Sequence, residues 1–288
     1  MIQKKVLVES PGRINLIGEH IDYNGGKVLP AAIKNKIIFQ LESIQGVKCY
    51  IQSKTIDKSF IININSLEKS ETHWENYIIG VLKNLIEKRK LLINGVKCLI
   101  DGDLPIGAGI SSSSSLICGF IKGLDQLNNL NLTNNDIIDI AREVEHNFIG
   151  LTGGIMDQST ILNGKKNKVL LIDCKNRSFD FIDSDFGRYK FLLLNTNIEH
   201  KLSDSLYNMR VGECRSALNE IKSRYKKVNY LCDVSLKILN EFKGTMDEVV
   251  FNRAQFVIQE HERVLNSVKK IKESKFKEFG MLMYESHY

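Results

Sequence analysis

Hydrophobic and polar positions follow two different periods along this chain. In the first third, apolar residues alternate with polar ones or form short runs rich in Ile, Val and Phe, which is typical of β-strands. This pattern predicts strands at 4–8, within 27–44, and at 47–53, 59–64 and 96–101. Two further strands are predicted at 168–173 and 189–195, with a turn region between them.

Apolar residues spaced by three and four predict the helices. Tyr77, Val81 and Leu85 share one face of a helix over 73–87, and the same spacing continues after a run of serines, from Leu116 to Leu127. Another helix begins at Thr133, where Asp136 three residues later resembles a capping box, and ends at Gly150. The remainder is predicted to be mainly helical, at about 205–226, 230–243, 247–270 and 274–286.

The order of these elements indicates two domains. A chain of 288 residues can form one large or two smaller domains, each with a core. Because helices follow a mixed α/β half, we place an N-terminal domain at 1–185 and a C-terminal domain at 186–288.

Composition and charge exclude several classes of protein. The apolar fraction of 43% and the charged fraction of 26% are those of a soluble globular protein. The chain shows no signal peptide and no apolar run long enough to span a bilayer, so we expect a cytoplasmic protein without a membrane partner. The six cysteines form no CxxC pair, which favours reduced, mostly buried thiols. The net charge is +6, but the lysines are scattered among glutamates, so we expect no nucleic-acid partner.

The stretch PGRINLIGEHIDYNGGKVLP, residues 11–30, combines charge with apolar residues. Arg13, Glu19, His20 and Asp22 alternate with isoleucines and leucines, which indicates a polar wall held by an apolar anchor. We interpret it as the substrate-recognition loop of an enzyme. Two readings of Arg13 stay open: an ion pair that stabilises the fold, or a cation that keeps Asp157 ionised by lowering its pKa. His20 is either a structural imidazole or a group that binds hydroxyls.

A Gly-rich loop, PIGAGISSSSS at 105–115, is the clearest chemical signal. Gly107 and Gly109 permit a tight turn, and the serines open a helix whose unpaired N–H groups suit phosphate. Serine hydroxyls can also bind Mg²⁺. The loop is neither a GxxxxGK[ST] nor a GxGxxG motif, so the pattern does not name a nucleotide by itself.

Three further residues carry alternative readings. Asp157 follows two glycines and is a general base, a metal ligand or a helix N-cap. Glu145 by itself reads as a surface carboxylate. Trp74, the only tryptophan, is either a core residue or a group that stacks beside a purine.

Several of these segments resemble galactokinases, within the superfamily of galactose, homoserine, mevalonate and phosphomevalonate kinases. The signature GRINLIGEHIDYNGGKVLP carries the resemblance, and PIGAGISSSSSL resembles the phosphate loop of the superfamily. The other similar segments are EHNFIGLTGGIMDQ, WENYIIGV, NTNIEHKLSDSLYNMR and FGMLMYESHY. The resemblance implies an α+β fold with an N-terminal mixed α/β domain that binds sugar and ATP and an incomplete, ferredoxin-like C-terminal domain.

The resemblance also implies a role for each matching residue. Asp157 would be the base or the charge that activates the anomeric hydroxyl, and Arg13 would orient it and stabilise the transferring phosphoryl group. Mg²⁺ would be held by Ser113 and Glu145, and adenine would lie near Trp74. Sugar hydroxyls would be bound by Glu19, His20, Asp22, Gly154 and Tyr207. The ATP phosphates would be cradled by Gly107, Ala108, Gly109, Ile110, Ser111, Ser112 and Ser113.

The chain departs from the family pattern in four places. The third, Gly-rich motif of the family is absent before Tyr288, so we expect either a fragment or impaired activity, and exposed hydrophobic surface that favours self-association. Gly153 stands where Cys is common, Ser115 extends the serine run, and Glu199 stands where a basic residue is frequent.

The expected activity is ATP-dependent phosphorylation of α-D-galactose at the anomeric hydroxyl, the first step of galactose catabolism. The alternatives are a non-catalytic or decayed paralogue that binds galactose and ATP, and an N-acetylgalactosamine kinase. We expect a monomer if the chain is complete.

Overall fold

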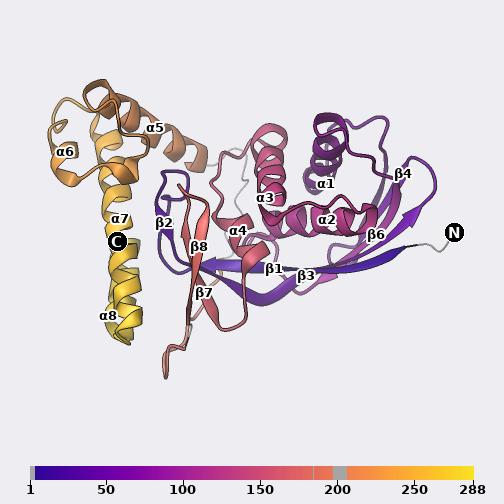
Figure 1. The fold of residues 1–288 in the computed structure, drawn as a ribbon, viewed down its shortest axis with the longest axis horizontal. Helices are drawn as coiled ribbons and strands as arrows, with labels where there is room; N and C mark the ends of the chain where they lie inside the picture. The colour runs from indigo at the N-terminus through magenta and orange to yellow at the C-terminus, as the bar shows by residue number, and fades with distance from the viewer. Residues whose placement is uncertain (1–3, 184, 197–205) are drawn as a thin grey trace. The chain divides into compact units, whose positions relative to one another are not determined.

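The structure is a computed structural model that describes residues 4–183, 185–196 and 206–288. Contacts divide the chain into two compact units, each built from separate segments (Figure 1). The first unit takes residues 1–14, 32–151 and 157–163, and the second takes residues 15–31, 152–156 and 164–288. This grouping differs from the boundary that we placed at 185, because residues 15–31 and 164–185 group with the C-terminal helices. The domain boundary itself stays a prediction.

The first unit is built on a mixed five-stranded sheet with the strand order β1-β3-β6-β4-β5. β6 pairs antiparallel with β3, from Ile37 opposite Gly102 to Ile44 opposite Gly95, and parallel with β4. β4 and β5 form an antiparallel pair. The strands are β1 Lys5–Asn15, β3 Pro30–Ile44, β4 Lys48–Ser53, β5 Lys58–Asn63 and β6 Gly95–Gly102.

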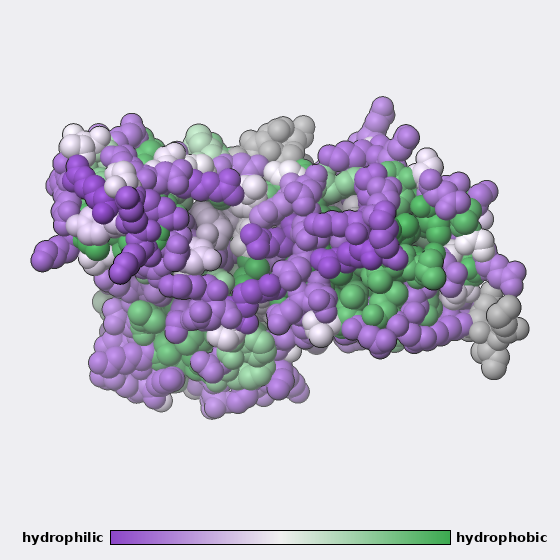
Figure 2. Space-filling view, turned by 45° about the horizontal axis from the view of Figure 1, so that its top comes forward, coloured by the Kyte–Doolittle hydropathy of each residue, from purple (hydrophilic) through white to green (hydrophobic). Residues whose placement is uncertain are grey.

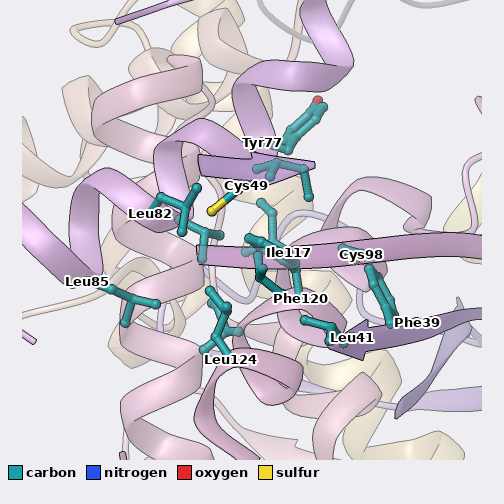
Figure 3. Packing of buried hydrophobic residues seen from close by; sticks show 14 of the residues in the cluster. Phe39, Leu41, Cys49, Tyr77, Leu82, Leu85, Cys98, Ile117, Phe120 and Leu124 are labelled. Atoms are coloured by element: carbon teal, nitrogen blue, oxygen red, sulfur yellow. The ribbon is translucent and has the colours of Figure 1, made fainter. Parts of the chain in front are cut away.

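Helices pack on this sheet and enclose the core of the unit (Figure 1). They are α1 His73–Lys83, α2 Ser112–Asn128, α3 Asn134–Glu143 and α4 Met156–Asn163. Figure 3 shows Phe39, Leu41 and Cys98 from the strands in one cluster with side chains of α1 and α2. The alternating burial of β4, with every second residue buried, follows from this one-sided packing.

Two helices have notable ends. α3 begins with the predicted capping box, in which the Thr133 hydroxyl accepts from the Asp136 N–H and Asp136 accepts from the Thr133 N–H. α1 and α3 each continue as a π-helical turn, at Asn84–Lys88 and Val144–Ile149. Such turns are frequent at functional sites, and the second one carries Glu145.

The second unit combines a small antiparallel sheet, ordered β2-β7-β8, with helices. The long helix α7 contacts α5, α6, α8 and β2. The elements are β2 Lys27–Val28, β7 Lys168–Asp173, β8 Ser178–Asp183, α5 Leu206–Arg224, a 3₁₀ turn Leu231–Asp233, α6 Leu236–Asn240, α7 Glu248–Lys272 and α8 Phe276–His287.

The predicted α+β class is confirmed, and two element predictions are wrong. Residues 189–195 form no strand, because no described segment pairs with their backbone, and β8 lies at Ser178–Asp183 instead. The helix predicted at 230–243 is replaced by two short pieces. Residues 197–205, which include Glu199 and part of the NTNIEHKLSDSLYNMR segment, lie outside the described residues.

Hydrophilic residues cover most of the face shown in Figure 2, with hydrophobic residues in separate groups. One exposed run is apolar: Leu192, Leu193 and Leu194 are 80%, 58% and 80% exposed. Within the described residues, no helix is both apolar and long enough to cross a bilayer. All six cysteines are unpaired, and four of them are buried, as predicted.

Candidate active site

Arg13 and Asp157 form a two-pronged ion pair in the first unit. β1 carries Arg13, and the first turn of α4 carries Asp157. The Arg13 Nε lies 2.6 Å from Asp157 Oδ1, and Nη2 lies 2.8 Å from Oδ2. The two side chains are 14% and 25% exposed, so the pair is only partly screened by water. Such a parallel arrangement fixes the orientation of the carboxylate as well as its charge.

The phosphate-loop serines join the same carboxylate. Ser111, the residue before α2, donates its hydroxyl to Asp157 Oδ2. The Ser111 side chain therefore does not cap α2, and no side-chain cap replaces it. The first N–H groups of a helix have no partners inside the helix, so this end of α2 can accept an anion.

The loop before α2 is open and has the conformation that glycine permits. Gly107 and Gly109 have φ of +73° and +72°, and an added Cβ on either would meet nothing within 4 Å. The Gly109 carbonyl accepts from Arg13 Nη1 at 2.8 Å, and the Ile110 carbonyl accepts from the Arg13 N–H at 3.1 Å. Ala108 lies half-buried between the two glycines. Arg13 therefore ties β1 to the loop and to Asp157.

Glu145 is a buried carboxyl group close to this pair. Ser114 donates to its Oε1 at 2.7 Å, and Gln158 Nε2 donates to Oε2 at 2.6 Å. Burial raises its pKa to about 8; the bonds from Ser114 and Gln158 and the charge of Arg13 lower the pKa, and Asp157 raises it. With this pKa the group is largely protonated at pH 7, and a divalent cation beside it would favour the charged form.

Ser113, the other predicted metal ligand, lies in the first turn of α2. Among the described residues, its hydroxyl has no side-chain hydrogen bond, and Ser114 occupies the contact with Glu145. Mg²⁺ commonly binds one or two carboxylates together with substrate phosphates, so Glu145 is of the ligand type such an ion takes, and the pairing with Ser113 stays a prediction. Within the described residues, no group of three or more His, Cys, Asp or Glu side chains is arranged as a metal site.

Ser115 anchors the start of α2 to β1. The Ser115 hydroxyl donates to the Ser10 carbonyl and the Ser10 hydroxyl donates to the Ser115 carbonyl, both at 2.8 Å. Both residues are almost fully buried. Ser115, the fifth serine of the run, is therefore a packing residue. It fixes the position of the first turn of α2 relative to β1, the strand that carries Arg13.

The second unit holds the polar stretch after Arg13. Leu16, Ile17 and Ile21 are buried, as predicted for the apolar anchor. The exposed Glu19 accepts from Asn15 Nδ2 at 2.9 Å. Because the anchor fixes the backbone, the polar side chains between these residues project from a rigid base.

His20 sits within an aromatic cluster in this unit. Its Nδ1 lies 2.8 Å from the Tyr23 hydroxyl, and its ring centroid lies 5.4 Å from that of Tyr207 on α5. His20 has φ of +62°, a conformation that a non-glycine residue keeps only when its surroundings hold it. Burial lowers the pKa of His20, and Arg210 lowers it further. The ring is therefore neutral at pH 7.

Asp22 and Gly154 come together in the same unit. A Cβ on Gly154 would lie 2.2 Å from Asp22 Oδ2, so only glycine leaves space for this carboxylate. Gly153 is less crowded, with the Tyr207 hydroxyl 3.9 Å from an added Cβ. The structure thus groups His20 with Tyr207 and Asp22 with Gly154, four of the five predicted sugar-binding residues.

Trp74 packs against the core of the first unit. Its ring meets that of Phe60 edge to face, with centroids 4.9 Å apart. The buried indole N–H has no hydrogen-bond partner among the described residues. This placement fits the core reading of Trp74, and its position near adenine stays a prediction.

The sequence did not point to four residues that contact the predicted ones. Gln158 and Ser114 hold Glu145, Tyr23 holds His20, and Glu260 accepts from backbone N–H groups at 18 and 19. Gln158, Ser114 and Tyr23 are each next in sequence to a predicted site residue, so that proximity was an available signal. Glu260 is 241 residues from Glu19 in sequence, and nothing local marks it.

Comparisons with known proteins agree with this arrangement. Residues 2–42 match the galactokinase galactose-binding signature, and residues 76–165 match the N-terminal domain of GHMP kinases. The galactokinase of Clostridium tetani is 39% identical over 97% of this chain and 71% of its own length. That of Thermosipho africanus is 38% identical over 97% of this chain and 76% of its own.

A solved structure matches over nearly the same span. Lactococcus lactis galactokinase complexed with galactose superposes with a TM-score of 0.90 and 30% identity, over 98% of this chain and 74% of that chain. The identities, the coverage and the matched signature have one explanation: this chain belongs to the galactokinase family.

Proposed function

We propose that this chain catalyses the ATP-dependent phosphorylation of α-D-galactose at its anomeric hydroxyl, which gives galactose 1-phosphate and ADP. The observation that carries the proposal is the two-pronged pair of Arg13 with Asp157, joined by Ser111 at the start of α2. A carboxylate held by a cation beside a phosphate-binding helix end is what transfer of a phosphoryl group to a hydroxyl requires.

Asp157 acts on the hydroxyl. A carboxylate offers about four acceptor positions, and Arg13 and Ser111 take three of them, which leaves about one for the sugar hydroxyl. The hydroxyl gives its proton to Asp157, or is activated by the negative charge, as its oxygen bonds to the γ-phosphorus. The bond from that phosphorus to the β,γ-bridging oxygen breaks, and ADP leaves.

The Gly-rich loop before α2 binds the phosphates of ATP. Backbone N–H groups from Gly107 to Ser113 bind ATP oxygens, and Arg13 offsets charge on the transferring group. Mg²⁺ held by Glu145 and Ser113 would neutralise phosphate charge. We assign adenine to the neighbourhood of Trp74.

The sugar is selected in the second unit. Glu19, His20, Asp22, Gly154 and Tyr207 bind its hydroxyls, with Gly154 leaving room for the Asp22 carboxylate. The C. tetani and T. africanus relatives are both galactokinases, which favours galactose over N-acetylgalactosamine. Six unpaired cysteines fit a reducing compartment, and we place the enzyme in the cytoplasm.

A coupled assay of ADP release tests the function. We expect ADP release that depends on galactose, ATP and Mg²⁺, and a ³¹P signal of a sugar 1-phosphate among the products. Galactose binding in calorimetry without turnover would instead support the non-catalytic alternative. Turnover with N-acetylgalactosamine but not with galactose would favour the other kinase.

A further inference from the structure

The buried carboxylate of Glu260 gathers four hydrogen bonds in the second unit. Glu260 lies on α7 and is 0% exposed. Its Oε1 accepts from the Gly18 N–H at 2.8 Å, from the Glu19 N–H at 3.0 Å and from the Ser286 hydroxyl at 2.7 Å. Its Oε2 accepts from Arg263 Nε at 2.7 Å. We propose that Glu260 is a positioning residue for galactose binding, which holds the backbone turn that presents Glu19 and His20.

Two consecutive N–H groups that converge on one carboxylate oxygen fix the direction of the backbone. The bonds are charge-assisted, and the Gly18 bond is buried while the Glu19 bond is partly buried, so they resist rotation of the peptide planes at 18 and 19. At this point the chain passes close to its neighbours: an added Cβ on Gly18, where φ is +113°, would lie 3.0 Å from Val28 Cα and 3.3 Å from Val264 Cγ2. α7 thus holds the turn both by packing and by the carboxylate.

The turn needs such support because the next residue is strained. His20 has φ of +62°, and a strained residue persists only where contacts on both sides determine it. On the far side, Asn24 Nδ2 donates to the His20 carbonyl at 2.8 Å. On the near side, the Gly18 and Glu19 N–H groups donate to Glu260 and so fix the backbone that leads into His20. Without Glu260, the near side would keep the backbone bonds of Leu16 and Ile17 with Leu29 but would lose the two bonds closest to His20. The Glu19 and His20 side chains would then leave their sugar-binding positions.

The inference rests on the proposed function, because it assumes that Glu19 and His20 bind galactose. Arg263 and Ser286 also bind the Glu260 carboxylate. Arg263 forms an ion pair with Oε2, and Ser286 on α8 donates its hydroxyl to Oε1. Among the described residues, the side-chain hydrogen bonds of both go to Glu260, so substituting Ser286 perturbs the carboxylate without removing its bonds to the turn.

The test measures galactose binding by calorimetry and KM and kcat by ADP release for Glu260→Ala and Glu260→Gln. We expect about tenfold weaker galactose binding and a matching rise in KM for Glu260→Ala, with KM for ATP within about twofold of wild type. Glu260→Gln keeps one acceptor oxygen for the two N–H groups, so its affinity should fall between those of wild type and Glu260→Ala.

Three variants make the result specific. Glu262→Gln removes an exposed carboxylate from the same helix and should change neither binding nor stability. Val257→Ala weakens the packing of α7 and should lower Tm without changing the affinity for galactose. Ser286→Ala should behave like Val257→Ala. If Glu260→Ala does not fold, Glu260→Gln carries the test alone.

The outcomes separate the inference from the proposed function. If Glu19→Ala weakens galactose binding but Glu260→Gln lowers only Tm, Glu260 is a structural tie and the inference is overturned. If Glu19→Ala leaves galactose binding unchanged, the sugar assignment of the turn fails first. If Val257→Ala weakens galactose binding as much as Glu260→Gln does, loss of stability explains both, and the inference is also overturned.

Discussion

Three hydrogen bonds fix the carboxylate of Asp157. Its carboxylate accepts from Arg13 at 2.6 and 2.8 Å and from Ser111. Asp157→Asn keeps the shape but removes the charge and the proton acceptor, so we expect kcat to fall by about 100-fold or more. Circular dichroism and Tm should show a folded protein. Asp180→Ala, an exposed carboxylate on β8, is the control and should leave kcat unchanged. A kcat of Asp157→Asn close to wild type would show that the base is assigned to the wrong residue.

His20 gives a prediction in pH. Burial lowers its pKa below 6.5, so between the lowered pKa and 6.5 the unfolded chain binds more protons than the native protein. The free energy of unfolding therefore rises with pH through this window and levels off above 6.5. His20→Gln should flatten that rise in urea titrations. Burial also lowers the pKa of His261, so part of the rise of the free energy of unfolding with pH should remain in this variant. The exposed His287→Gln is the control; if it flattens the curve equally, burial of His20 is not the cause.

The phosphate loop can be tested as an element by comparing two glycines. Gly109 and Gly46 both have positive φ, and an added Cβ on either meets nothing within 4 Å. Ala at either position should cost about 1 kcal/mol of stability through backbone strain. Only Gly109→Ala should also raise KM for ATP, because only that loop would bind phosphate. Equal values of KM for ATP in the two variants would remove the phosphate role from the loop.

The serine run is expected to divide into packing and chemical positions. Ser115→Ala breaks a buried bond to Ser10 and should lower the free energy of unfolding by about 1–3 kcal/mol. Ser113→Ala loses no side-chain bond to a described residue, so stability should change by less than about 0.5 kcal/mol. Its kcat should fall and its Mg²⁺ requirement should rise. An unchanged Mg²⁺ titration curve would argue against Ser113 as a ligand.

Elements were predictable where local pattern and tertiary contact agree. The alternation at 48–53 and the capping box of Thr133 and Asp136 are local, and the structure has both. The apolar run at 189–195 predicts a strand, but a strand needs a partner, and no described segment supplies one. The region predicted to be a turn between 173 and 189 holds β8 instead, because Ser178–Asp183 pairs with β7 across the sheet.

The candidate site was predictable only in part, for a related reason. A motif names residues that act on a substrate, such as Arg13 and Asp157, but not the residues that hold them. The bonds of Ser10 with Ser115 and of Glu260 with Gly18 join positions 105 and 242 residues apart. Such pairs depend on the three-dimensional fold and leave no trace in local spacing.

For the whole molecule, exposed leucines predict how the protein behaves in solution. Leu192, Leu193 and Leu194 form an apolar run at 58–80% exposure. Burying this run between copies would be favourable, so we expect self-association that increases with protein concentration. Leu192→Lys combined with Leu194→Lys should reduce it in sedimentation velocity. The control is Leu92→Lys, because Leu92 is 91% exposed but lies outside this run. A wild-type protein that stays monomeric at all concentrations would contradict the prediction.

The central claim is that this chain itself transfers phosphate to galactose through Asp157. The most direct test is the initial rate of galactose-dependent ADP release by the wild-type chain, measured beside Asp157→Ala at the same concentrations. We predict turnover by the wild type and a loss of about 100-fold or more in the variant, with both proteins folded. Equal rates for the two proteins, or no galactose-dependent ADP from the wild type, would contradict the account.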